Sequence, residues 1–303
     1  MTNYCGYIAF MGRPNAGKST LVNALVGQKV AGVSRKPQTT RNKILGIATS
    51  AEHQLLFLDT PGMHRSKGYA RINALMNKEA FSVIADADAI VYTVDLTEGW
   101  DDEDTEFFKQ IQGAASDELQ RVYLTKADCL KKKDMMIACR EITATIRNLG
   151  FEGKVQPVSA KRADSITEVF EDLKCLLPEG PFQFDEDDVT DRSTRFLISE
   201  LIRESLFRQF GQELPYDMAV VVESFKTTPE LVSIQADIYV ARESQKGMVV
   251  GKRGAKIREI GIESRQKIQD LLGSKVFLET HVRVRDGWNQ DKSSIAELTD
   301  ITF

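Results

Sequence analysis

The chain has 303 residues, of which 42% are hydrophobic and 28% are charged, a composition typical of a globular protein with room for two moderate cores. No apolar run approaches the ~20 residues of a membrane span, and the first residues do not resemble a secretion signal, so we expect a cytoplasmic protein. The formal charge of -4 argues against uniform coating of nucleic acid, and the four cysteines lie far apart without the spacing of a zinc site.

The first half of the chain alternates short apolar runs with longer amphipathic ones. The apolar runs that we interpret as strands are 7–12, 54–62, 88–96, 121–128 and 155–160. The helical patterns between them are 16–27, 72–87, 105–112 and 135–150. This alternation predicts an α/β domain with a mostly parallel sheet that is covered by helices on both faces.

The second half follows a stretch rich in proline, glycine and acidic residues, which we interpret as an exposed linker. After it, the pattern predicts a helix, two strands, two helical segments and a final strand, which together form a smaller α+β domain. The predicted organisation is a first domain over 1–178, a linker over 179–192, a second domain over 193–290 and a tail over 291–303.

The stretch "GRPNAGKS", residues 12–19, joins the first predicted strand to the first helix. Its glycines let the backbone fold around phosphate oxygens, with N–H groups pointing inward at a helix start. Lys18 supplies a positive charge for the β- and γ-phosphates, and the Ser19 hydroxyl is placed to hold Mg²⁺. The alternative, a chance match in a flexible turn, is disfavoured by the flanking strand and helix. The residues expected around the phosphates are Asn15, Ala16, Gly17, Lys18, Ser19 and Thr20.

A second motif, "LLFLDTPG", ends a strand at Asp59 and continues to Gly62. Beside a phosphate-binding loop, Asp59 is expected to hold Mg²⁺ through water, and the Gly62 N–H to reach the γ-phosphate and sense its loss. Taken alone, Asp59 suits a helix cap equally well. The assignment of Asp59 to Mg²⁺ rather than to a helix cap therefore depends on the phosphate-binding loop that precedes it.

The next two strand ends carry the residues expected to recognise the base. Asp128, in "TKAD", can accept two hydrogen bonds from the N1–H and the exocyclic amine of guanine, a pair that adenine lacks. After the following strand, "SAK" places the backbone N–H of Ala160 where it can contact the guanine oxygen. We therefore expect GTP and GDP as the ligands. The base-side residues are Thr125, Lys126, Asp128, Ser159, Ala160 and Lys161.

With these four motifs in order, the first 180 residues resemble a translation-factor-type GTPase domain. The resemblance implies a mobile threonine that completes Mg²⁺ coordination when GTP is bound. In "RKPQTTR", Thr40 matches that position best and Thr39 is the alternative. The residues to which the resemblance gives catalytic roles are Lys18, Thr40, Asp59 and Gly62, and the metal ligands are Ser19, Thr40 and, through water, Asp59.

Three residues bear on how well this site works. Thr125 stands where related GTPases usually have asparagine, so guanine selectivity rests on Asp128 and nucleotide is held more loosely. Met63 stands where Ras-like enzymes place a water-orienting glutamine, and methionine cannot position water, so we expect slow intrinsic hydrolysis that depends on another group. Asn15 is one candidate, because P-loops of similar GTPases with asparagine there bind K⁺. A solvated loop asparagine is the alternative.

The second predicted domain contains "GMVVGKRGAKIREIG", in which a GxxG turn joins two helical segments. In KH domains such a turn brings the main chain against about four nucleotides of single-stranded RNA. From residue 242 to residue 285 there are eleven Lys or Arg and five Asp or Glu, a local excess of positive charge in an acidic chain. A solvated basic helix hairpin is the alternative. The residues expected to contact RNA are Gly251, Lys252, Arg253, Gly254, Lys256 and Arg258.

The element order around this turn is similar to a type II KH domain, and with "PQTTR" and "DTPG" the whole chain resembles the Era family of bacterial ribosome-assembly GTPases. The resemblance implies binding to unpaired 16S rRNA near its 3′ end during 30S maturation. Because a γ-phosphate sensor and an RNA-binding module lie on one chain, we also expect a GTP-dependent switch that positions the KH domain. The resemblance also implies peripheral contact with the inner membrane, although we find no amphipathic stretch that explains such contact. We expect a monomer.

Three other functions fit parts of the pattern. A KH-domain adaptor whose nucleotide site is a sensor with negligible turnover is supported by Met63. An ATP-driven remodeller requires Asp128 to be an ordinary surface carboxylate. A GTPase that modifies transfer RNA is disfavoured, because we see no cysteine-bearing catalytic tail and no folate-type domain.

Overall fold

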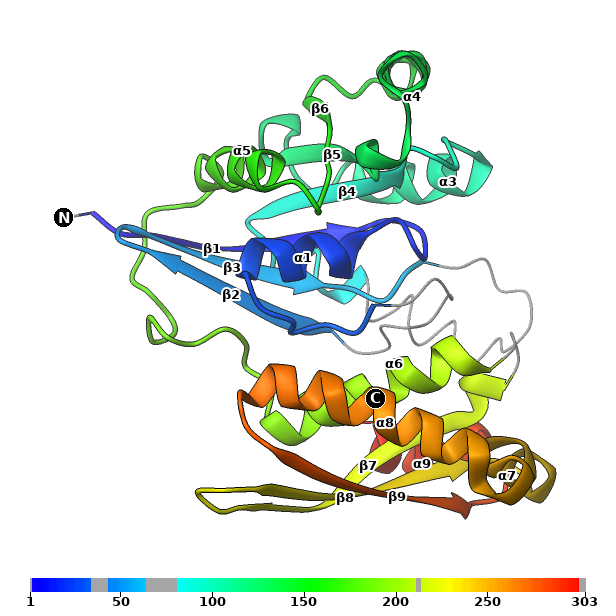
Figure 1. Cartoon of the computed structure of the whole chain (residues 1–303). Coiled ribbons are helices and arrows are strands. Elements are labelled where there is room, and N and C mark those ends of the chain that lie inside the picture. Colours follow the sequence, from blue (N-terminus) through cyan, green and yellow to red (C-terminus); the bar gives the residue numbers. More distant parts are fainter. Residues whose placement is uncertain (1, 34–42, 64–80, 211–213, 300–303) are drawn as a thin grey trace. The chain divides into compact units, whose positions relative to one another are not determined.

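The computed structural model describes residues 2–33, 43–63, 81–210 and 214–299. They form two compact units: the first extends to Asp191 and the second begins at Arg192, with Gly32 and Val33 grouped with the second. Each unit has its own sheet (Figure 1). Each also has its own hydrophobic core. Within the described residues, no helix combines the length and the apolar character needed to cross a membrane.

The first unit contains a six-stranded sheet with the order β2-β3-β1-β4-β5-β6. Only β2 runs antiparallel to its neighbour β3, and all other neighbouring strands are parallel. The predicted α/β class with a mostly parallel sheet is therefore confirmed, while β2 is a strand that the sequence pattern did not reveal. The strands are β1 (Tyr4–Met11), β2 (Ile44–Ser50), β3 (His53–Asp59), β4 (Ala89–Asp95), β5 (Gln120–Thr125) and β6 (Lys154–Pro157).

Helices cover both faces of this sheet, as predicted. α1 (Lys18–Val26) and α5 (Ala163–Lys174) pack on one face, and α3 (Asp102–Ile111) and α4 (Lys132–Asn148) pack on the other (Figure 1). The strands carry apolar side chains on both faces and can therefore pack against both helix layers; every residue of β4 is buried. Because the strands run parallel, their carboxyl ends meet at one edge, where ligands bind in such sheets.

The helix predicted over 72–87 falls mostly outside the described residues. Phe81 and Ser82 are helical, and residues 83–86 form turns rather than continuing the helix. The short 3₁₀ segments of the first unit are Asp117–Leu119, before β5, and Ala127–Cys129, after it.

The segment from residue 179 to residue 191, which we expected to be an exposed linker, is held against the first unit. The buried side chain of Gln54 in β3 accepts hydrogen bonds from the main-chain N–H groups of Gln183 (2.7 Å) and Phe184 (3.1 Å). In addition, the Ile47 N–H donates to the carbonyl O of Val189 at 2.9 Å. The segment thus covers the exposed edge strand β2, which is a common fate for unpaired sheet edges.

The second unit is α+β, as predicted. Its sheet has the order β7-β8-β9, with β7 antiparallel and β9 parallel to β8. Helices α6 and α8 pack on one face of it. The elements are α6 (Thr194–Gln209), a 3₁₀ turn (Leu214–Asp217), β7 (Met218–Thr227), β8 (Val232–Val240), α7 (Glu243–Val250), a 3₁₀ turn (Lys252–Gly254), α8 (Ala255–Leu272), β9 (Val276–Val284), a 3₁₀ turn (Trp288–Gln290) and α9 (Lys292–Thr299).

The predicted C-terminal tail contains helix α9, which belongs to the second unit. Ile295 and Leu298 are buried with Trp288 against Ala219 and Ala241, on a small core separate from the one beneath α6 and α8. The tail therefore begins as a packed helix rather than as a free extension of the chain. Burial of its apolar residues is the physical reason.

Candidate nucleotide site and nucleic-acid interface

The loop between β1 and α1 has the backbone that the "GRPNAGKS" motif predicts. Three of its residues have positive φ angles: Gly12 (138°), Asn15 (64°) and Gly17 (90°). A side chain at residue 12 is excluded, because a Cβ there would lie 2.4 Å from the carbonyl O of Thr93 in β4. A glycine-bearing loop that leads into a helix N-terminus is an arrangement suited to phosphate.

Lys18, the first residue of α1, lies beneath this loop. Its Nζ donates to the carbonyl oxygens of Gly12 (3.0 Å) and Arg13 (2.8 Å). Burial lowers the pKa of Lys18 to about 8, since the charged ammonium loses its hydration. The loop thus holds a buried cation at its inner surface, where an anionic ligand would stabilise it.

Ser19 and Asp59 are brought together from α1 and the end of β3, as the sequence predicted. The Ser19 hydroxyl donates to Asp59 Oδ2 at 2.6 Å, and the Asp59 side chain is fully buried. Hydroxyl and carboxylate oxygens are the ligand types that Mg²⁺ prefers, so the pair fits such an ion. Thr20 follows on α1 and is partly buried. Thr40 and Thr39 lie outside the described residues.

Gly62 and Met63 lie directly against the loop. A Cβ at Gly62 would come within 2.6 Å of Pro14 Cα, so only glycine allows this approach. The Met63 N–H donates to the carbonyl O of Gly12 at 3.3 Å, while the Met63 side chain is fully buried in the core of the first unit. The Met63 side chain therefore presents no polar group to the loop, and only the main-chain N–H of this residue contacts it.

Thr125 connects the loop to the sheet. Its hydroxyl lies 2.7 Å from the carbonyl O of Ala16 and 3.1 Å from that of Val94, both at hydrogen-bonding distance. A Cβ at Gly17 would lie 3.2 Å from the same hydroxyl. Thr125 thus ties the loop between β1 and α1 to the ends of β4 and β5.

Asp128 is held in place by two residues of the "SAK" stretch. The Ser159 hydroxyl donates to Oδ1 at 2.8 Å, and Lys161 Nζ lies 3.1 Å from Oδ2. Partial burial opposes ionisation, but these hydrogen bonds outweigh it and hold the pKa of Asp128 below its usual value. Ala160 lies between the two partners and is partly buried. Asp128, Ser159 and Lys161 are therefore clustered, as expected of base-side residues.

Lys126, next to Asp128 in the motif, has a positive φ angle of 59°. Its ammonium forms an ion pair with Asp95, the buried last residue of β4. Asp95 also accepts hydrogen bonds from the N–H (2.9 Å) and the hydroxyl (2.6 Å) of Thr97. We did not single out Asp95 from the sequence, although its position at a strand end beside the other motifs was a usable signal.

In the second unit, the GxxG turn has the left-handed conformations that its glycines allow. Gly251 and Gly254 have φ angles of 71° and 75°, and Arg253 between them also has a positive φ of 53°. Lys252 and Arg253 are exposed. Lys256 is exposed as well, with its ammonium 4.9 Å from the centre of the Phe210 ring.

A groove of about 440 Å³ lies beside this turn, between α8 and β9. Its basic residues are Arg253, Arg258 and Arg265, and its apolar floor is formed by side chains of both elements. The floor and rim residues are Ile257, Ile262, Leu278 and Thr280. Basic side chains around an apolar floor suit a chain of phosphates with unstacked bases.

Comparisons with known proteins agree with both halves of this description. A family model described as 50S ribosome-binding GTPase matches residues 7–126, and a KH domain model matches residues 213–289. The chain is 43% identical to GTPase Era of Stenotrophomonas maltophilia strain K279a over 293 residues, which is 97% of this chain and 96% of the relative. It is 44% identical to GTPase Era of Xylella fastidiosa strain M12, over 96% and 95% of the two chains.

The chain belongs to the Era family of GTPases. Two solved Era structures have the same fold over 99% of this chain and all of theirs. One is an Aquifex aeolicus Era variant bound to GDP·AlF₄⁻, with a TM-score of 0.89 and 33% identity. The other is Era in complex with MgGDPNP and nucleotides 1506–1542 of 16S ribosomal RNA, with a TM-score of 0.90 and 32% identity. GTP hydrolysis is the activity of this family, as the sequence predicted.

In this Era family member, sequence reasoning missed the role of Arg13 within the loop motif. Its guanidinium forms ion pairs with Asp101 and Asp104 at the start of α3, and Nη2 donates to the carbonyl O of Gly99 at 3.0 Å. Asp101 and Asp104 also form a capping box for α3. That Asp-x-x-Asp spacing was the available signal, but nothing in the sequence connected it to Arg13.

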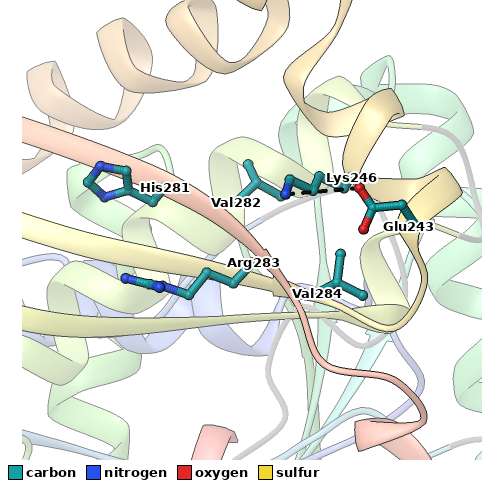
Figure 2. Close-up of a pocket in the computed structure, with 6 residues that line it drawn as sticks. All are labelled: Glu243, Lys246, His281, Val282, Arg283 and Val284. Carbon is teal, nitrogen blue, oxygen red and sulfur yellow. Dashed lines mark ion pairs between the residues drawn. The ribbon is translucent and has the colours of Figure 1, made fainter.

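A second hollow of the KH unit, of about 520 Å³, lies between the start of α7 and the end of β9 (Figure 2). Val282 and Val284 line it, together with Lys246 from α7. The positive charges here are already matched, because Lys246 pairs with Glu243 at 3.9 Å and Arg283 pairs with Asp237. Its charge balance thus differs from that of the groove beside the GxxG turn.

Proposed function

We propose that this Era family GTPase binds single-stranded 16S rRNA near its 3′ end through the KH groove, and acts in the assembly and maturation of the 30S subunit. The basic groove beside the GxxG turn carries the proposal, since it offers guanidinium groups for phosphates and an apolar floor for bases. The Era structure with nucleotides 1506–1542 supports the choice of RNA. The expected contacts come from Gly251, Lys252, Arg253, Gly254, Lys256 and Arg258.

For the nucleotide, we propose that the phosphates lie in the loop between β1 and α1. The expected contacts come from Asn15, Ala16, Gly17, Lys18, Ser19 and Thr20. The Ser19 and Asp59 oxygens and the Thr40 hydroxyl would hold Mg²⁺, directly or through water, and the bound ion would supply positive charge to the phosphates. Lys18 then exchanges two neutral carbonyl partners for phosphate oxygens. The Gly62 N–H reports the presence of the γ-phosphate.

We assign the base to the cluster around Asp128. The carboxylate is ionised and held by Ser159 and Lys161, so it is ready to accept the N1–H and the exocyclic amine of guanine. Adenine would leave this carboxylate without donors, which is a strong basis for rejection. Competition of labelled GTP by excess ATP tests this assignment: ATP should not displace GTP.

The proposed mechanism is a switch in which GTP and Mg²⁺ order the segments that contain Thr40 and Gly62, and thereby change how the KH domain binds RNA. The test measures binding of the full chain to RNA of nucleotides 1506–1542 with GDPNP, with GDP and without nucleotide. The expected result is tighter binding with GDPNP. Equal affinity in all three states would contradict the switch, because a ligand shifts only an equilibrium in which it binds the two states unequally.

We propose that hydrolysis is slow in the isolated protein and that Asn15 helps to bind K⁺ beside the phosphates. The burial of Met63 supports slow turnover, because the side chain at position 63 lies in the core and has no polar group that could orient water. The same observation favours a second candidate function, an RNA-binding adaptor with negligible turnover. Phosphate release measured with and without the RNA separates the two candidates, since an RNA-stimulated rate is expected only of the switch.

Finally, we propose a monomer that contacts the inner membrane peripherally. This proposal comes from the family resemblance, and the described helices include none that could cross a membrane. Flotation of the full chain with anionic lipid vesicles, compared with neutral ones, tests the contact. Sedimentation equilibrium tests the monomer.

A further inference from the structure

Gly261 occupies an unfavourable position for a glycine. It lies in the interior of α8, an 18-residue helix, where glycine costs about 0.5 to 1 kcal/mol of stability relative to alanine. Its backbone is not in the left-handed region that requires glycine. No atom lies within 4 Å of the place that a Cβ would occupy, so close packing does not exclude a side chain either.

The open space beside Gly261 belongs to the groove at the GxxG turn. Gly261 lines this groove with Arg258 and Arg265, which lie about one helical turn before and after it on the same face of α8. Across the groove are Leu278 and Thr280 of β9. Helix main chain is thus bare at the middle of the groove, between two guanidinium groups.

The surroundings indicate which kind of ligand group lies against this bare surface. Ile262, next to Gly261, is an isoleucine that leaves 58% of its surface exposed, although it lies on a groove wall. An apolar surface flanked by positive charges is suited to an unstacked nucleotide base, with its phosphates near the arginines. A methyl group on Gly261 would project from the helix into this space.

We propose that Gly261 is a specificity-determining position at which one base of single-stranded RNA packs directly on the main chain of α8. The inference rests on the proposed RNA-binding function and deepens it. Gly261 makes no charged contact itself, so its contribution is the shape of the groove. Arg258 and Arg265 contribute electrostatic attraction to the phosphates on either side.

The test is Gly261→Ala in the full chain, with fluorescently labelled RNA of nucleotides 1506–1542 of 16S rRNA as the probe. Two effects of opposite sign are expected. Alanine should raise the unfolding midpoint of the KH unit, because it is the better helix former. At the same time, RNA affinity should fall about tenfold, the size of effect that follows from disturbing the contact of one base.

The matched control is Gly247→Ala. Gly247 also lies in a helix, α7, with nothing within 4 Å of an added Cβ, and it does not line the groove. The Gly247→Ala protein should gain stability, and its RNA affinity should stay within about twofold of that of the unchanged protein. A salt titration adds a second readout: Gly261→Ala should leave the salt dependence of binding unchanged, whereas Arg258→Ala should lower its slope by about one.

The inference is overturned if Gly261→Ala binds the RNA as tightly as the unchanged protein, or if Gly247→Ala weakens binding to the same extent. Either result would show that the groove does not use the bare helix. Failure of the proposed function looks different, since the unchanged protein itself would then not bind this RNA.

Discussion

Arg13 and Asp104 join the phosphate-binding loop to helix α3: the guanidinium Nε lies 3.0 Å from Oδ2 of a fully buried carboxylate. The other oxygen of Asp104 accepts a hydrogen bond from the Tyr92 hydroxyl at 3.0 Å, and the Asp101 N–H also donates to Oδ2. The carbonyl O of Arg13 meanwhile accepts from Lys18. One residue therefore fixes the loop from its outer side and supports the lysine within it.

This pair predicts a pH-dependent effect of Arg13→Met. Burial raises the pKa of Asp104 to about 6, while the charge of Arg13 lowers it. The folded protein then holds a proton that the unfolded chain has lost, so stability falls as pH rises from about 4 to 6, in total by about 3 kcal/mol for this group. Without Arg13 the pKa of Asp104 rises further, so the loss of folding stability continues to higher pH.

Arg13→Met should therefore destabilise the first unit by about 3 to 5 kcal/mol at pH 7.5, and much less at pH 5. Urea unfolding at the two pH values, followed by hydrogen exchange of peptides from β4 and α3, measures the difference. Arg13→Lys keeps the charge and should lose less at pH 7.5. Equal losses at both pH values would show that the effect is one of packing and not of charge.

Thr125 makes a second prediction, on nucleotide retention. Thr125→Val keeps the shape of the side chain but removes the hydroxyl that lies between the carbonyl oxygens of Ala16 and Val94. Removing the one donor beside these two buried carbonyl oxygens costs roughly 1 to 3 kcal/mol, so we expect GDP to dissociate about ten to a hundred times faster. Stopped-flow release of fluorescent GDP measures the rate. Thr125→Ser retains the hydroxyl and should stay within about threefold of the original rate.

The sequence predicted the local geometry of the loop between β1 and α1 well, because the conformation of this loop is set by residues that are close in sequence. Gly12 to Ser19 form one turn between a strand and a helix, and every contact that defines the motif is made within that turn or at a neighbouring strand end. The GxxG turn is predictable for the same reason. Positive φ angles at Gly251 and Gly254 are a local property of the chain.

What the sequence did not reveal depends on contacts between distant residues. Arg13 and Asp104 are 91 positions apart, and neither residue type at its place specifies the partner. The antiparallel strand β2 (Ile44–Ser50) ends in alanine, threonine and serine, so its apolar pattern is short. The covering of its edge by residues up to Val189 involves a buried amide in β3 and a main-chain hydrogen bond from Ile47, which no periodicity indicates.

That amide gives a third prediction. Gln54→Leu preserves side-chain volume but removes both acceptor and donor, since Nε2 also donates to the carbonyl O of Phe184 at 2.8 Å. The N–H groups of Gln183 and Phe184 should then exchange with solvent at least about tenfold faster, with a loss of stability of roughly 1 to 3 kcal/mol. Hydrogen exchange with mass spectrometry resolves this segment.

The control for Gln54→Leu is Ser50→Ala. Ser50 lies in the same hairpin, and its hydroxyl donates to the carbonyl O of His53 at 3.3 Å, within the hairpin. It should leave the exchange of Gln183 and Phe184 unchanged. Unchanged protection in Gln54→Leu as well would mean that Phe184 is held by packing alone.

The last prediction concerns Asn15 and the proposed K⁺ ion. Asn15 has a φ angle of 64°, a conformation that asparagine and glycine tolerate better than alanine does. Asn15→Gly therefore removes the side-chain oxygen without backbone strain, and is a sharper test than Asn15→Ala, which adds about 1 kcal/mol or more of strain.

If the amide oxygen helps to hold K⁺, the unchanged protein should hydrolyse GTP at least about tenfold faster in K⁺ than in Na⁺, because a fixed positive charge stabilises the developing negative charge. Asn15→Gly should lose this difference between the two salts when both proteins are saturated with GTP, so that a change in nucleotide affinity does not affect the comparison. Equal rates of the unchanged protein in the two salts would remove the ion from the mechanism and leave the RNA or another partner as the group that supports hydrolysis beside the buried Met63.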